Sequence, residues 1–494
     1  MSELRLQDFK RLARKGTHVA LTQVIPCDLE TPVSCFLKLA GKSKRAFLLE
    51  SAEQGEKIGR YSFIGFDPSA VLLSENGRIS EICGSVRVQH KDLPFIRLLE
   101  SRNKGLNLAN PESLPEFCGG WVGYFSYENV ADFETIKLTA KNGPAAPDAV
   151  FFCTRELAIF DHFRKTLTLA VIADVRSGVL HEYQSACKRL AHMQKRLQSP
   201  LSTRPAAKSA VVKAAFKSNI SKNQFIRSVQ KIKSYVRAGD CIQVVFSQRL
   251  SVPSMGDSSF QIYRALRSIN PSPHMFYFCY DKLRLIGSSP ELLVKKEGRT
   301  AEVRPIAGTR PRGASAQEDL KYENQLKQSK KEMAEHLMLV DLGRNDLGRV
   351  CKFESVKVAD FAKIERFSHV MHLVSQVAGE LKPGKNAFDL LRATFPAGTV
   401  TGAPKIRAMQ IIDELESEKR GPYAGCLGYF SFTQNMEMCI TIRTLVDDGR
   451  RLYVQAGAGV VQDSSPLKEY QETLNKAQAL LHAVKNREHF ACCS

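Results

Sequence analysis

A chain of 494 residues, 43% hydrophobic and 25% charged, is expected to form a soluble globular protein of two or more domains. It has no apolar run of about 18 residues, and its N-terminal segment is polar and basic, so we expect neither a membrane span nor a secretory signal. The net charge of +20 is spread along the chain without a basic block, which argues against a nucleic-acid partner and leaves open an anionic substrate, an acidic partner or a compositional bias.

The first part of the chain predicts an antiparallel sheet, because short β-like runs alternate in polarity and are separated by turn residues. These runs lie at 46–51, 61–66, 70–75, 122–127, 149–154, 157–162 and 167–173. The segment 198–219 is rich in Ser, Ala, Lys and Pro and predicts a linker. It divides the chain into predicted domains at 17–197 and 220–485.

After this linker, predicted strands and helices interleave. Helical patterns cover 223–239, 318–346 and 465–484. Strand patterns cover 241–250, 274–280, 283–289, 300–308, 439–446 and 451–461. Because the strands follow one another as hairpins, we predict an α+β fold, with antiparallel β-sheets and helices on the outside, rather than a Rossmann sheet.

Two predicted helices each carry a pair of glutamates three residues apart, Glu332 with Glu335 and Glu469 with Glu472. This spacing places each pair on one helix face. A solvated acidic face is the ordinary interpretation, but Glu335 directly precedes the apolar run HLMLV. Oxygen ligands from two helices would suit Mg²⁺, which takes one or two protein carboxylates together with water and substrate oxygens.

Several segments of the second half could bind an anion. In RPIAGTRPRG (304–313), prolines stiffen a basic loop and Gly308 permits close approach of a ligand. Gly402 and Pro404 precede a helical pattern, and the glycines of QAGAGVV lie in a predicted strand. Arg443 is a charged residue in an apolar strand pattern, where either a substrate carboxylate or an internal salt bridge would pair with it.

Many segments of the chain, in order, resemble the chorismate-binding enzymes, and within that family the large subunits of anthranilate synthases. The resemblance extends from about residue 21 to about residue 484. The segments that carry it are LLES (48–51), GRYSFIG (59–65), GDCIQVV (239–245), NPSPHMF (270–276), SSPELL (288–293), RPIAGTRPRG, EHLMLVDLGRNDLGRV (335–350), SHVMHLVS (368–375), FPAGTVTGAPKIRAM (395–409) and VQAGAGVVQDS (454–464).

The resemblance implies a reaction in which chorismate is aminated and then loses pyruvate to give anthranilate. It also implies an anthranilate synthase-like sandwich, with a regulatory domain at 17–197 and a catalytic domain at 220–485. Glu291 matches the general acid, and Glu335 and Glu472 match the Mg²⁺ ligands, with Glu332 and Glu469 beside them. Other catalytic positions are His372, Thr399 and Gln243. Substrate-contact positions are Gly308, Thr309, Tyr423, Arg443, Gly457, Ala458, Gly459 and Lys476.

Two positions distinguish among the members of the family. Aminodeoxychorismate synthases typically carry Lys where this chain has Ala307, and isochorismate-forming relatives carry Lys where it has Gln243. The absence of both amines indicates that free ammonia is the nucleophile. An aminodeoxychorismate synthase with an exceptional Ala307 and a non-catalytic regulatory protein on the same scaffold are the alternatives.

The chain lacks the elbow of a glutaminase. Its nearest match surrounds Cys426, with the wrong glycine spacing and without the following His-Gln. The 13 cysteines are scattered, mostly in apolar segments, which predicts reduced thiols in a cytoplasmic protein. The resemblance therefore implies a separate glutamine amidotransferase subunit that supplies ammonia within a hetero-oligomer.

The resemblance also implies feedback inhibition by L-tryptophan. The implied effector residues are Ser51, Pro273, His274 and Met275, with Glu50 or a backbone carbonyl as acceptor for the ammonium group. The family usually has Tyr at the position of His274 and Trp at that of Ile58. Both departures lie near the effector segments, so they bear on regulation more than on catalysis.

Overall fold

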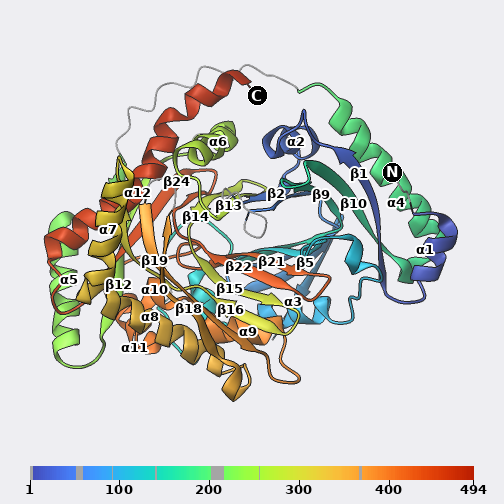
Figure 1. Cartoon of the computed structure of the whole chain (residues 1–494). Coiled ribbons are helices and arrows are strands. Elements are labelled where there is room, and N and C mark those ends of the chain that lie inside the picture. Colours follow the sequence, from blue (N-terminus) through green and yellow to red (C-terminus); the bar gives the residue numbers. More distant parts are fainter. Residues whose placement is uncertain are drawn as a thin grey trace.

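The computed structural model describes residues 4–51, 59–91, 93–139, 142–201, 216–254, 256–366 and 370–493 (Figure 1). Within these ranges no helix has both the length and the apolar character needed to cross a membrane.

Two antiparallel sheets of twelve strands each form the body of the molecule. In sheet 1 the order is β1 (His18–Pro26), β10 (Thr166–Asp174), β9 (Glu156–Asp161), β3 (Tyr61–Phe66), β2 (Arg45–Glu50), β13 (His274–Tyr280), β14 (Leu283–Ser289), β23 (Thr444–Asp447), β24 (Arg451–Val460), β12 (Gln243–Pro253) and β11 (Lys217–Ser218), with β20 (Gly402–Ala403) beside β12. In sheet 2 the order is β17 (Ile306–Pro311), β19 (Val370–Glu380), β16 (Thr300–Val303), β15 (Leu292–Glu297), β22 (Met436–Ile440), β21 (Cys426–Ser431), β7 (Gly120–Phe125), β8 (Ala149–Thr154), β4 (Ala70–Glu75), β5 (Arg78–Cys83) and β6 (Val86–His90), with β18 (Lys357–Arg366) beside β19.

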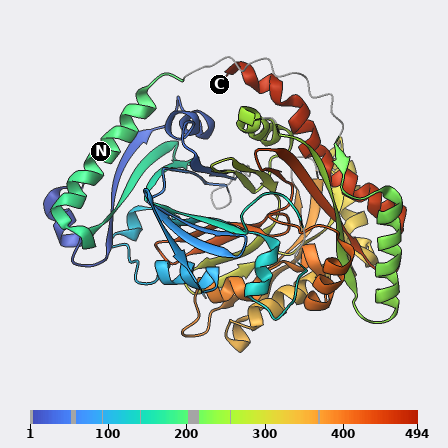
Figure 2. The ribbon, with the colours of Figure 1, turned by 180° about the vertical axis from the view of Figure 1, so that it is seen from behind.

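The sheets pack face to face, and helices lie around the outside (Figure 2). Aromatic residues of both sheets fill the layer between them, as where Phe278 of sheet 1 stacks on Phe152 of sheet 2. The helices are α1 (Leu6–Leu12), α2 (Pro32–Leu39), α3 (Phe95–Asn103), α4 (Val179–Gln198), α5 (Lys222–Arg237), α6 (Ser259–Ile269), α7 (Ala316–Gln328), α8 (Lys330–Gly348), α9 (Ala387–Thr394), α10 (Gly398–Thr401), α11 (Lys405–Leu415) and α12 (Pro466–Asn486). The predicted α+β sandwich of antiparallel sheets is confirmed.

Both halves of the chain contribute strands to both sheets. In sheet 1, β2 pairs with β13, and in sheet 2, β7 pairs with β21. The predicted linker begins where α4 ends, but its residues 202–215 lie outside the described part of the chain. The division into regulatory and catalytic domains stays a prediction, and the sheets themselves are continuous across it.

The predicted single helix at 318–346 is wrong, because the chain forms two helices there. Ser329 adopts an extended conformation and caps α8, its side chain accepting a hydrogen bond from the Glu332 amide at 3.4 Å. This break places Glu332 and Glu335 in the first turns of α8 rather than in the middle of a long helix. The predicted strand at 300–308 is likewise divided between β16 and β17.

Candidate functional site

The chain crosses from one sheet to the other at two adjacent points, and a predicted site residue lies at each. Glu291 lies between β14 and β15, and Arg443 lies between β22 and β23. The carbonyl of Glu291 accepts from the Ile440 amide at 3.0 Å, and the carbonyl of Arg443 accepts from the Ser288 amide at 3.1 Å. The predicted continuous strand at 439–446 is therefore wrong, because Arg443, with φ of 49°, turns the chain between the sheets.

Glu291 is a buried carboxyl group, with 8% of its surface exposed. Burial raises its pKa to about 7, against the opposing influence of the Thr399 hydroxyl and of the positive charges of Lys476 and Arg443. Such a group is protonated in a large fraction of molecules at neutral pH. It can therefore donate a proton to a leaving group.

The loop that carries Ala307 contains a bulge at Gly308, where the pairing of β17 with β19 skips a residue. Gly308 has φ of 61°, and a Cβ there would lie 2.7 Å from the Leu326 side chain and 3.0 Å from a Glu332 oxygen. A residue with a Cβ would be strained by this positive φ and would have to displace the ends of the Leu326 and Glu332 side chains, so glycine is favoured here. Ala307 is buried beside it with 8% of its surface exposed.

His372 lies against this bulge. Its Nδ1 is 2.9 Å from the Gly308 carbonyl and 3.1 Å from the Thr309 hydroxyl. Because a carbonyl can only accept, Nδ1 carries the proton and the lone pair of the neutral ring lies on Nε2. Burial lowers the pKa of His372, which favours this neutral form and makes Nε2 a proton acceptor.

The glutamates of α8 and α12 lie close enough for the charge of Glu472 to act on Glu335. Burial raises the pKa of Glu335, and the nearby carboxylates of Glu332 and Glu472 raise it further. Burial likewise raises the pKa of Glu469, with Glu472 acting in the same direction. Gln243 donates to Glu335 at 3.3 Å.

This mutual repulsion is the setting in which a cation is favoured, so the carboxylates fit a Mg²⁺ ion. Among the residues that the structure describes, no three carboxylate, imidazole or thiol groups are placed to hold a metal on their own. A site in which one or two carboxylates are completed by water and substrate oxygens agrees with the repulsion between the carboxylates and with the lack of a third protein ligand among the described residues.

A glycine-containing segment of β24 forms the remaining wall. Gly457 and Gly459 lie opposite Ser247 and Val245 of β12. A Cβ at Gly457 would lie 2.8 Å from the Tyr423 hydroxyl, and one at Gly459 would lie 2.6 Å from the Gln243 amide nitrogen. These glycines therefore admit neighbouring polar groups that a side chain would displace.

Lys476 contacts both the glycine-containing segment of β24 and one of the glutamates of α12. Its ammonium group donates to the Gly457 carbonyl at 2.9 Å and pairs with Glu472 at 2.6 Å. Burial lowers the pKa of Arg443, while Tyr423, Glu472 and Glu291 favour its charged form. The structure thus brings together the predicted catalytic, substrate-contact and carboxylate residues, Ala458 of the same strand included. Gly402 lies beside Gln243, because the backbone of Gly402 pairs with Val244 and that of Ala403 pairs with Gln243, and Pro404 occupies the N-cap position of α11.

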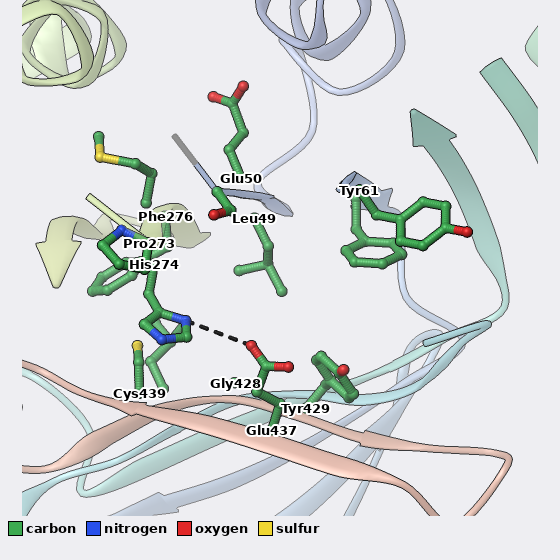
Figure 3. A pocket seen from close by; sticks show the side chains of 14 residues that line it. Leu49, Glu50, Tyr61, Pro273, His274, Phe276, Gly428, Tyr429, Glu437 and Cys439 are labelled. Atoms are coloured by element: carbon green, nitrogen blue, oxygen red, sulfur yellow. Dashed lines mark ion pairs between the residues drawn. The ribbon is translucent and has the colours of Figure 1, made fainter. Parts of the chain in front are cut away.

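A second pocket lies apart from this site, between β2, β13, β21 and β22 (Figure 3). All four predicted effector residues line it: Ser51, Pro273, His274 and Met275. The Ser51 hydroxyl is buried without a hydrogen-bond partner among the described residues. Ile58 lies outside the described residues.

Sequence reasoning missed the carboxylate that faces into this pocket, Glu437. Figure 3 shows Glu437 and His274 facing each other, at 3.5 Å, whereas the Glu50 carboxylate points away from them. Glu50 accepts from the Tyr263 hydroxyl and from Arg267. Burial lowers the pKa of His274 to about 4, so this imidazole is neutral at pH 7. The isolated charge in the apolar run MEMCI was the signal for Glu437.

Comparisons with known proteins give consistent findings. The family described as chorismate binding enzyme matches residues 44–482. Anthranilate synthase component 1 of Acetivibrio thermocellus is 45% identical, over 97% of this chain and 98% of its own. The protein of the same name from Aquifex aeolicus is also 45% identical, over 98% of each chain.

Solved structures have the same fold. Anthranilate synthase component I from Streptococcus pneumoniae superposes with a TM-score of 0.76 at 35% identity, over 92% of this chain and 98% of that one. A menaquinone-specific isochorismate synthase from Escherichia coli superposes with a TM-score of 0.71 over 97% and 98%, and its 18% identity supports the fold alone.

Proposed function

This chain belongs to the chorismate-binding enzyme family, and we propose that it is the large subunit of an anthranilate synthase that converts chorismate and ammonia to anthranilate, pyruvate and water in tryptophan biosynthesis. The observation that carries the proposal is the burial of Glu291, which raises its pKa to about 7, in a site whose two diagnostic positions, Ala307 and Gln243, hold no amine.

The chain's own residues account for the steps. Glu291 donates a proton to the ring C4 hydroxyl, which leaves as water while ammonia bonds to ring C2. His372 Nε2 then accepts the C2 proton while the bond between ring C3 and the enolpyruvyl oxygen breaks, which makes the ring aromatic. The released enolpyruvate takes up a proton at its CH2 carbon to become pyruvate. Arg443 and Lys476 provide positive charge for the two carboxylates of the substrate.

Glu335 and Glu472 would hold Mg²⁺, with Glu332 and Glu469 beside them. When bound, Mg²⁺ would grip the ring carboxylate and draw electron density from the ring.

The alternatives account for fewer features. An aminodeoxychorismate synthase would have to work without the lysine at position 307. A non-catalytic protein would have no need of a buried Glu291, nor of the carboxylates grouped around Glu335.

We expect the purified chain to form anthranilate from chorismate, ammonium and Mg²⁺, and to be inactive when glutamine replaces ammonium. The reason is that the sequence lacks a glutaminase elbow, so a partner must release ammonia. Anthranilate fluorescence with chromatographic identification of the product checks both expectations.

The product distinguishes the alternatives. Aminodeoxychorismate in place of anthranilate would support the first alternative, and no turnover under any amine would support the second. Glutamine-dependent activity of the chain, free of any copurifying subunit, would contradict the need for a partner.

We also propose that L-tryptophan inhibits from the pocket of Figure 3. Met275 and Phe63 provide apolar surface for an indole ring, and the Ser51 hydroxyl can form a hydrogen bond with the bound amino acid. Glu437 is better placed than Glu50 to accept from its ammonium group, because Glu50 already bonds Tyr263 and Arg267.

The same strand connects this pocket to the catalytic site. Glu437 and Cys439 line the pocket, and the next residue, Ile440, donates its amide to the Glu291 carbonyl at 3.0 Å. A ligand that displaces β22 would thereby displace the backbone that holds the general acid.

We expect L-tryptophan to inhibit the wild type and Ser51→Phe to be insensitive while retaining its kcat, because the ring fills the pocket. Ser85→Phe, at an exposed position between β5 and β6, is the matched control and should remain sensitive. Initial rates with and without tryptophan provide the measurement. A wild type unaffected by millimolar tryptophan, or a Ser51→Phe variant as sensitive as the wild type, would show that the pocket has another role.

A further inference from the structure

Arg420 is a buried charged residue that takes no part in the proposed chemistry, yet it contacts several elements of the site. Only 2% of its surface is exposed. We propose, on the basis of the function proposed above, that Arg420 is a positioning residue whose guanidinium group holds the segment of Thr399, the strand of Gln243 and the ring of Tyr423 in their catalytic arrangement.

The guanidinium group makes a two-pronged contact with Glu416, at 2.9 Å from Nε and 2.7 Å from Nη2. Its other donors reach two main-chain carbonyls, that of Val400 at 2.7 Å and that of Val245 at 2.7 Å. A planar fork with five donors can satisfy all of these acceptors at once, whereas a lysine ammonium cannot.

Each of these acceptors belongs to a wall of the site. Val400 follows Thr399 in α10, and the Thr399 hydroxyl lies close enough to Glu291 to favour its ionised form. Val245 lies two residues after Gln243 on β12 and opposite Gly459 of β24. A movement of Arg420 would therefore be transmitted to the general acid and to the glycine-containing wall together.

Glu416 connects Arg420 to Ser247 of β12 and, through it, to Gly457 of β24. Its Oε1 accepts from the Ser247 amide at 2.9 Å and from the Ser247 hydroxyl at 2.7 Å. Ser247 is paired with Gly457, whose carbonyl accepts from Lys476. The Arg420–Glu416 pair thus holds β12 at two alternate residues, Val245 and Ser247.

Two tyrosine rings and a carboxylate fix Arg420 itself. Its guanidinium carbon lies 4.8 Å from the ring centre of Tyr127 and 5.6 Å from that of Tyr423. Glu128, in the short helix η2 (Tyr127–Asp132), accepts from the Arg420 amide at 2.7 Å and from the Gly421 amide at 3.0 Å.

A second buried arginine in the same region provides a matched control. Arg249 pairs with Glu418 at 2.6 Å and donates to Gln455 at 3.0 Å and to the Arg420 carbonyl at 3.3 Å. It stabilises the same loop, but its hydrogen bonds include neither the Val400 carbonyl nor the Val245 carbonyl. A purely structural role would make the two arginines equivalent.

The test compares Arg420→Lys with Arg249→Lys in the full chain, using chorismate and ammonium. Both variants should melt at a lower temperature than the wild type. Only Arg420→Lys should lose about tenfold or more of kcat, with a KM for chorismate that changes less than kcat, because the groups that act on the bound ring are displaced.

The pH profile gives a second readout. The Thr399 hydroxyl, Arg443 and Lys476 all favour the ionised form of Glu291. Displacement of Thr399 in Arg420→Lys should therefore move the alkaline limb of the rate profile to higher pH, whereas Arg249→Lys should leave it unchanged.

Equal kcat and equal profiles for Arg420→Lys and the wild type, or equal losses in both arginine variants, would overturn the proposal. If Arg420→Lys does not fold, Glu416→Gln takes its place, since the amide keeps an oxygen for Ser247 but removes the anionic partner of Arg420. It should lower kcat and shift the profile in the same direction, and an unchanged Glu416→Gln enzyme would also overturn the proposal.

These results are separable from the proposed function. The product formed by the wild type tests the reaction. The difference between the two arginine variants tests positioning, whichever chorismate-derived amine is formed.

Discussion

Replacement of Glu291 by Gln is expected to lower kcat by about 10²–10⁴-fold, the range for loss of a positioned general acid. The amide matches the carboxyl group in shape but cannot supply a proton to the leaving hydroxyl. Burial of Glu291 and its raised pKa are the features that make this group the acid. Steady-state kinetics with chorismate, ammonium and Mg²⁺ measure the loss, and KM for chorismate should change much less than kcat.

The same group determines a pH dependence. Since the active form of Glu291 is protonated and its pKa is about 7, the rate should fall as pH rises through that value. The profile must be measured at a constant concentration of uncharged ammonia, because that concentration itself rises with pH. Because burial raises the pKa of Glu291 from 4.5 to about 7, folding stability falls as pH rises between these two values and stays lower above them. Glu291→Gln lacks this loss and should therefore be the more stable protein at pH 7 and above.

Glu297 provides the control for Glu291. It lies at the end of the following strand, β15, with 57% of its side chain exposed. Glu297→Gln should leave kcat and the pH profile unchanged. A Glu291→Gln enzyme with near-normal turnover would exclude Glu291 as the acid.

The second large effect is expected at the carboxylates. Glu335→Ala and Glu472→Ala should each lower kcat/KM at least about tenfold, roughly 1.4 kcal/mol of transition-state stabilisation, at limiting Mg²⁺. Removal of a ligand weakens the hold on the cation that is proposed to grip the ring carboxylate. Kinetics as a function of Mg²⁺ concentration, with a chelated sample as the reference, provide the measurement.

Thermal stability separates ligand loss from unfolding. Burial and the neighbouring Glu332 and Glu472 raise the pKa of Glu335, so its charge opposes folding at neutral pH. Without metal, Glu335→Ala should therefore melt no lower than the wild type. Asp341→Ala, on the exposed face of the same helix with 53% of its side chain exposed, should have normal activity. If the rate depends on Mg²⁺ concentration in both glutamate variants as it does in the wild type, Glu335 and Glu472 are not the metal ligands.

The sequence predicted the strands more accurately than their connections. The predicted ranges 61–66, 70–75 and 149–154 coincide with β3, β4 and β8. The errors lie where one residue interrupts a segment whose sequence pattern predicts a single helix or strand. Ser329 caps a new helix inside a continuous helical pattern, and Arg443 turns the chain inside a continuous apolar strand pattern. Sequence reasoning missed the strands β5 and β6, which lie at the edge of a sheet. Apolar residues such as Val86 and Val88 are exposed there, so the strands lack the alternation of buried apolar and exposed polar residues that predicts a strand.

Prediction of the site residues depended more on information beyond the local sequence pattern than prediction of the strands did. By spacing alone, Glu332 and Glu335 indicate a solvated helix face, and only the family resemblance marked Glu335 and Glu472 as neighbours. Arg420 lies in the polar segment SEKRGPYAG, where charge ordinarily indicates surface. Its burial depends on Glu416 and on carbonyls from β12 and α10, which local periodicity does not predict.

The sharing of both sheets between the two halves of the chain has a consequence for biosynthesis. Phe47 of β2 pairs with Phe278 of β13, and Trp121 of β7 pairs with Phe430 of β21. At ~5–20 residues per second, a ribosome needs about 15–60 s to extend the chain from β7 to β21. Until β13 and then β21 are synthesised, one edge of β2 and one edge of β7, respectively, have no strand to pair with, and unpaired edges promote aggregation. The nascent N-terminal half is thus the form of this protein most dependent on chaperones, and any fragment that ends before β13 retains both open edges.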